Sequence, residues 1–98
     1  MTGTMSQLLI ANREEILRIC AKHGASNIRV FGSMARGDDG PDSDVDLLVD
    51  VGDEHTPWFP GSLIVDLQDL LGRKVDVVEP EAVHWYIRDH VLKEAVPI

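Results

Sequence analysis

The chain is poor in cysteine and in positive charge. Its one cysteine, Cys20, has no partner for a disulfide within the chain, which favours a reducing compartment, so we expect a cytoplasmic protein with Cys20 in its core. Lysine and arginine number 9 against 17 aspartate and glutamate residues, which gives a formal net charge of -8. Because duplex nucleic acids are bound by basic surfaces, direct nucleic-acid binding is not expected.

Long hydrophobic runs are also missing. No apolar stretch approaches the roughly 20 residues of a membrane-spanning helix, and the N-terminus lacks the basic segment and apolar block of a signal peptide. We therefore expect no membrane association. The 98 residues suffice for one hydrophobic core, so we expect a single domain over 1–98, with residues 1–5 flexible.

The apolar pattern predicts alternating helices and strands. Ser6 and Ser62 are suitable N-caps, and Gly24 and Gly72 are placed to end helices. We expect helices over 6–23, 62–71 and about 80–95, a helical turn over 33–36, and strands over 27–31, 44–51 and 74–78.

The connections between these strands predict their directions. The first and second strands are joined by too few residues for a crossover helix and should be antiparallel. The second and third are joined through a helix and should be parallel. The expected fold is α+β: a small mixed three-stranded sheet, order 1-2-3, packed with helices.

Polar residues gather at one end of this expected sheet. Gly32-Ser33 ends the first strand, and Asp44 and Asp46 begin the second, two residues apart and therefore on one face. Asp76 lies near the start of the third strand, which parallel pairing brings to the same end. Three clustered carboxylates need positive charge among them, and Mg²⁺ prefers carboxylate oxygens and leaves positions open for phosphates.

These residues suggest nucleotidyl transfer. Asp44 and Asp46 would bind two Mg²⁺ ions, and Asp76 would bind one of them and help accept the proton of an attacking hydroxyl. The backbone N–H groups of Gly32 and Ser33 would contact phosphates. Arg36, three residues after Ser33, is placed to steady a triphosphate.

The spacing Gly32-Ser33-x(10)-Asp44-x-Asp46 resembles the signature of the DNA polymerase β-like nucleotidyltransferase superfamily. The fuller strings FGSMARG (31–37), DSDVDLLV (42–49), LLGRKVDVV (70–78) and VLKEA (91–95) resemble its minimal nucleotidyltransferases. Met34 departs from this pattern, since many relatives carry a basic residue there, and we expect it to alter triphosphate affinity.

The resemblance implies a fold, a reaction and a partner. It implies the nucleotidyltransferase fold and an MntA-type antitoxin that transfers AMP from ATP to a tyrosine of a HEPN-domain ribonuclease toxin, with which it forms a hetero-oligomer. It assigns the metal carboxylates to Asp44, Asp46 and Asp76 and the phosphate-binding turn to Gly32 and Ser33.

Two other functions remain open at this stage. A non-catalytic antitoxin would neutralise its toxin by binding alone, and an acidic surface suits a basic protein partner. A nucleotidyltransferase with a small-molecule acceptor would need a second domain or a second copy to hold it. For Trp58 and Phe59 we favour packing over a helix end rather than a place in a base pocket or in a partner contact. Arg73 and Lys74 lie near phosphates or merely offset the acidic surface.

Overall fold

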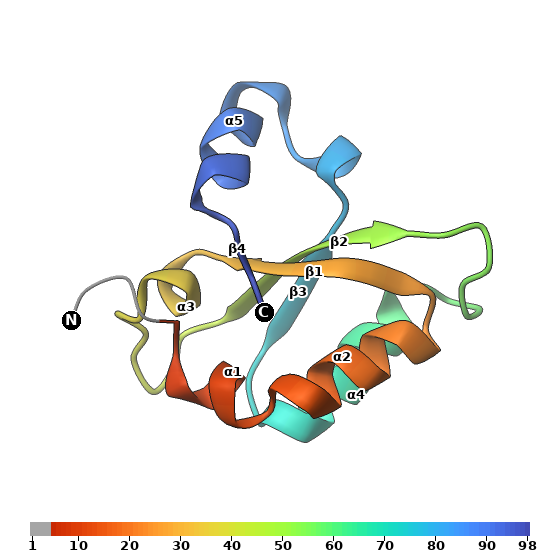
Figure 1. Cartoon of the computed structure of the whole chain (residues 1–98), viewed down its shortest axis with the longest axis horizontal. Coiled ribbons are helices and arrows are strands. Elements are labelled where there is room, and N and C mark those ends of the chain that lie inside the picture. Colours follow the sequence, from red (N-terminus) through yellow and green to blue (C-terminus); the bar gives the residue numbers. More distant parts are fainter. Residues whose placement is uncertain (1–4) are drawn as a thin grey trace.

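The computed structural model describes residues 5–98, so the expected flexibility of residues 1–4 falls outside it, while Met5 packs against the core. The fold is α+β, as expected (Figure 1). The helices are α1 (Gln7–Ala11), α2 (Arg13–Lys22), α3 (Ser33–Arg36), α4 (Gly61–Leu71), the 3₁₀ helix η1 (Pro80–Ala82) and α5 (Trp85–Glu94). The strands are β1 (Ala25–Phe31), β2 (Val45–Val51), β3 (Val75–Val78) and β4 (Val96–Pro97). None of the helices in 5–98 is long and apolar enough to span a bilayer.

The sheet has the order β3-β2-β1-β4. The predicted directions are confirmed, because β2 runs antiparallel to β1 and parallel to β3. The prediction of three strands was wrong: β4 adds a fourth, antiparallel to β1. Its two residues, one of them proline, are too short to produce a periodic pattern. The pairing depends on tertiary contacts, including the N–H of Ile98 donating to the Ile28 carbonyl at 3.1 Å.

The sheet separates two unequal layers (Figure 1). Helices α2 and α4 cover one face, where they bury a continuous core that includes Cys20, as predicted. This burial raises the pKa of the Cys20 thiol to about 12. The core residues of these helices and of the central strand are Ile16, Cys20, Leu63, Leu67, Leu71, Val45, Leu47 and Val49. Since side chains alternate along a strand, Asp44, Asp46 and Leu48 lie on the other face, above which α5 stands.

Three details of the helices differ from expectation. The stretch expected to be helical over about 80–95 is divided into η1 and α5. The segment predicted as one helix over 6–23 is broken at Asn12, whose side-chain amide donates to the Leu8 carbonyl at 2.8 Å and terminates α1. Ser6 caps α1 as predicted, accepting from the Leu8 N–H at 3.3 Å. Ser62 does not cap α4: it lies inside the helix and donates to the Pro57 carbonyl.

Candidate active site

The turn after β1 requires glycine. Gly32 has φ 78° and ψ −157°, a conformation that L-residues rarely adopt. A Cβ at this position would lie 2.8 Å from Oδ2 of Asp46. The missing side chain therefore permits both the turn and the close approach of Asp46. The helical turn predicted over Ser33–Arg36 follows directly as α3, and Gly37 ends it in the left-handed conformation.

The strand register brings the carboxylates to this turn. Asp46 pairs with Phe31, the residue before Gly32, in the antiparallel ladder and with Asp76 in the parallel ladder. Asp44 precedes β2 by one residue. Asp46 is half-buried, whereas Asp44 and Asp76 are exposed. One end of the sheet thus holds all three aspartates beside Gly32.

Electrostatics at this end of the sheet favour a cation. Burial raises the pKa of Asp46, and the charges of Asp76, Asp44 and Glu94 raise that pKa further, while Lys74 opposes them. Within residues 5–98 no three His, Cys, Asp or Glu side chains are already drawn together closely enough to hold a metal ion. The donor set nevertheless fits Mg²⁺, which takes carboxylate oxygens, and the exposed side chains of Asp44 and Asp76 have room to rotate toward one.

Arg36 and Gly32 share an acidic partner that sequence reasoning missed. One carboxylate oxygen of Glu94, Oε1, accepts from the Gly32 N–H at 2.6 Å and from Nη1 of Arg36 at 2.9 Å. Nε of Arg36 donates to Asp38 at 3.1 Å. The string 91–95 carried a family resemblance but no indication of this contact, which joins residues 62 positions apart.

Met34 and Ser33 follow Gly32 in the turn. Met34 is fully buried in the core. The Met34 side chain therefore packs in the core, and the expected effect of this departure on triphosphate affinity stays a prediction. Ser33 is half-buried, and its carbonyl accepts from the N–H groups of Gly37 and Asp38, which closes the turn.

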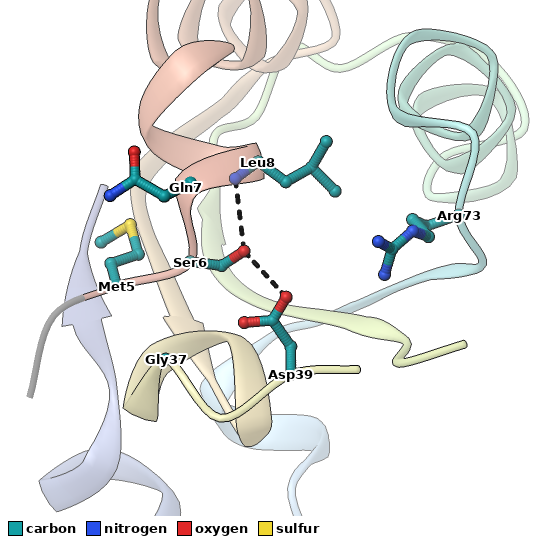
Figure 2. A pocket seen from close by; sticks show the side chains of 7 residues that line it. All are labelled: Met5, Ser6, Gln7, Leu8, Gly37, Asp39 and Arg73. Atoms are coloured by element: carbon teal, nitrogen blue, oxygen red, sulfur yellow. Dashed lines mark hydrogen bonds between the residues drawn. The ribbon is translucent and has the colours of Figure 1, made fainter. Parts of the chain in front are cut away.

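Arg73 braces the loop that leads to Asp44. Its Nη1 donates to the carbonyls of Gly40 at 3.1 Å and Ser43 at 3.3 Å, so its contacts are structural. Figure 2 shows the hollow of about 380 Å³ beside this loop, into which Arg73 points. The hollow is lined by Met5, Ser6, Gln7, Leu8, Gly37, Asp39 and Arg73 and includes none of the clustered aspartates. The carboxylate cluster therefore lies outside this hollow.

The two aromatic residues of the loop between β2 and α4 differ in their surroundings. Phe59 packs against the core, as favoured from the sequence, whereas Trp58 is 89% exposed. Neither side chain belongs to the carboxylate cluster.

A glycine turn and an Asp-x-Asp strand set on a small mixed sheet define a class of nucleotide-transferring protein. The chain belongs to the nucleotidyltransferase domain family, whose sequence profile matches residues 13–98.

Two relatives within this family carry names that are more specific than the name of the family. The chain is 35% identical over 94 residues to the protein adenylyltransferase MntA of Thermococcus cleftensis, covering 94% of this chain and 90% of that protein. It is 34% identical over 86 residues to a "putative protein adenylyltransferase" of Methanocaldococcus jannaschii, covering 88% and 92%.

Two solved structures resemble this one. A structure described as a "putative minimal nucleotidyltransferase" superposes with a TM-score of 0.83 at 42% identity and covers 97% of both chains. A chain from a crystal structure of a toxin–antitoxin with AMP-PNP superposes with a TM-score of 0.74 at 22% identity. It covers 88% of this chain and 71% of that chain, and the likeness is one of fold.

Proposed function

We propose that this chain is a Mg²⁺-dependent protein adenylyltransferase and antitoxin, which transfers AMP from ATP to a tyrosine of a partner HEPN ribonuclease toxin. The observation that carries the proposal is the position of Asp46. It lies beside Asp76 in the parallel register and against the glycine turn at Gly32. This arrangement puts candidate metal ligands next to backbone suited to phosphate.

Asp44, Asp46 and Asp76 are the proposed metal ligands. Burial, and then the charges of Asp76 and Asp44, raise the pKa of Asp46, and a divalent cation among the three carboxylates would offset their repulsion. When bound, Mg²⁺ would neutralise phosphate charge and stabilise the attacking and leaving oxygens. The backbone of two paired strands brings Asp46 and Asp76 side by side, with Asp44 one residue before β2.

The proposed reaction is an in-line displacement at the α-phosphorus of ATP. The acceptor tyrosine oxygen forms a bond to this phosphorus, the bond to the β-phosphate oxygen breaks, and pyrophosphate leaves. The proton of the tyrosine hydroxyl passes to the Asp76 carboxylate. The N–H groups of Gly32 and Ser33 and the guanidinium of Arg36 hold the phosphate oxygens.

The proposed partner is supported by the similarity to named relatives and not by the geometry of the carboxylates. Relatives covering most of this chain are named protein adenylyltransferases, one of them MntA, and a structure of the same fold comes from a toxin–antitoxin pair. The carboxylate site lies open at the sheet end, where a side chain of another protein has access. The chain's net charge of -8 also suits a basic partner.

Intact-mass spectrometry tests the proposal directly. The proposed HEPN partner is incubated with the purified chain, ATP and Mg²⁺, and we expect it to gain the mass of one AMP or a multiple. The double variant D44N/D46N should give no gain. D50N/D53N removes the same charge from the other end of β2 and the loop beyond, and should behave as the wild type.

The same variants separate the alternatives. If D44N/D46N still protects cells from the toxin, neutralisation proceeds by binding and the catalytic proposal fails. If the toxin gains no mass with the wild-type chain but a small molecule is adenylylated, the acceptor is not a protein.

A further inference from the structure

A carboxylate occupies the position where the proposed site would hold a phosphate. Glu94 Oε1 lies 2.6 Å from the Gly32 nitrogen and 2.9 Å from Nη1 of Arg36. A carboxylate oxygen and a phosphate oxygen are both anionic acceptors and make the same charge-assisted hydrogen bonds to these donors. The Gly32 N–H and the Arg36 guanidinium therefore cannot donate fully to Glu94 and to a triphosphate at the same time.

The position of Glu94 is set by the backbone. In the β1–β4 ladder Val30 pairs with Val96 and Arg29 with Pro97. Continuing this antiparallel register by two residues places Glu94 opposite Gly32. The short fourth strand thus delivers the carboxylate to the turn, which distinguishes this contact from a chance meeting of surface side chains.

Glu94 is well enclosed but not locked in place. Its side chain is 18% exposed, and its second oxygen, Oε2, lies 3.1 Å from Nε2 of the exposed His90. In α5, which carries both residues, only Val91 is buried, and the helix stands clear of the main core (Figure 1). Few packed contacts oppose a change of side-chain rotamer or a small displacement of this helix.

We propose that Glu94 is an autoinhibitory gate, whose carboxylate holds the Gly32 N–H and Arg36 in the free protein and is displaced when nucleotide phosphates bind. The inference rests on the proposed function, because it assumes that phosphates bind at this turn. The gate lowers nucleotide affinity in the free protein and couples nucleotide binding to the position of α5.

Calorimetric titration with Mg²⁺–ATP and with Mg²⁺–tripolyphosphate tests this competition. E94A removes the competing acceptor and should bind both probes about tenfold to a hundredfold more tightly than the wild type, the size expected for a lost charge-assisted hydrogen bond. E94Q keeps a neutral acceptor and should show a smaller gain. D89N removes one charge from an exposed position of the same helix and should leave both affinities unchanged.

Amide NMR supplies a second measurement. The Gly32 amide signal of E94Q should differ from that of the wild type without nucleotide, and the two signals should converge at saturating Mg²⁺–ATP. Equal or weaker binding by E94A, or equal tightening by E94A and D89N, would overturn the gate while leaving the proposed function intact. Failure of wild type, E94A and E94Q alike to bind either probe would overturn both proposals, whereas binding by E94A alone supports the gate.

Discussion

Asp46 and Asp76 are register partners in adjacent parallel strands, so their carboxylates project from the same face of the sheet. Asp46 is half-buried, and the β1 turn approaches it so closely that only glycine fits at position 32. The fold therefore holds negative charge together where solvent is partly excluded. Such an arrangement lowers the stability of the metal-free protein and creates affinity for a cation.

The first prediction concerns stability without metal. Because the folded-state pKa of Asp46 is raised, its contribution to stability is full below the unfolded pKa of about 3.8 and is lost as the pH rises through the folded value. D46N should therefore raise the melting temperature of the metal-free protein at pH 7 by a few degrees, a small gain because water screens this half-exposed carboxylate. Thermal melts in EDTA at pH 7 and pH 3 would measure a gain that vanishes at the lower pH.

The control for this prediction is D69N, which removes an exposed charge from α4. Its melting temperature should follow the wild type at both pH values. Addition of Mg²⁺ should stabilise the wild type and D69N but not D46N. A melting temperature for D46N below that of the wild type at pH 7 would contradict the electrostatic account.

The second prediction concerns the glycine turn. G32A introduces a Cβ that meets Asp46 Oδ2 and a backbone conformation that alanine rarely adopts. We expect it to lower the free energy of unfolding by about 1–3 kcal/mol and to reduce AMP transfer at least tenfold. G40A is the matched variant, since a Cβ there meets nothing within 4 Å. Chemical denaturation and the mass assay would measure both effects, and wild-type behaviour of G32A would contradict the assigned tight approach.

Sequence reasoning succeeded where the pattern is local and repeated. The apolar run in 45–51, the short connection from 27–31 and the helical connection to 75–78 predicted two strand pairings and hence the meeting of Asp46 with Asp76. Sequence reasoning failed for β4, because its two residues are extended only through their pairing with β1. The role of Glu94 was hidden for the same reason, because its place opposite Gly32 follows from the register of that strand.

The third prediction concerns a polar network between α2 and α4. His23 is 4% exposed, with Nδ1 2.6 Å from Thr56 Oγ1 and Nε2 2.6 Å from Asp66 Oδ2. H23A removes both hydrogen bonds and a buried ring, and should cost about 1–3 kcal/mol of stability. H84A, at an exposed histidine, is the control. Urea denaturation monitored by circular dichroism would measure the loss, and equal midpoints for the two variants would show that the network contributes nothing.

The same network gives a pH dependence, which is the fourth prediction. The hydrogen bond from His23 lowers the pKa of Asp66; burial opposes this shift, and the charges of Lys22 and His23 add to it. A lowered folded-state pKa contributes stability above the unfolded value of about 3.8, and this is lost as the pH falls through the folded value. D66N should therefore melt below the wild type at pH 7 and level with it near pH 2. D69N on the same helix should show no such convergence.

The fifth prediction concerns Arg73, which acts on the site through the loop. Its guanidinium spans the carbonyls of Gly40 and Ser43, immediately before Asp44. R73A should lower kcat for AMP transfer about tenfold with little change in KM for ATP, because Asp44 is positioned less accurately while the phosphate turn is untouched. R73K keeps the charge but lacks the forked donors, so it should rescue only part of the rate. R13A, at an exposed position of α2, should match the wild type. Full rescue by lysine would mean that charge alone matters, and an effect confined to KM would place Arg73 on the phosphates instead.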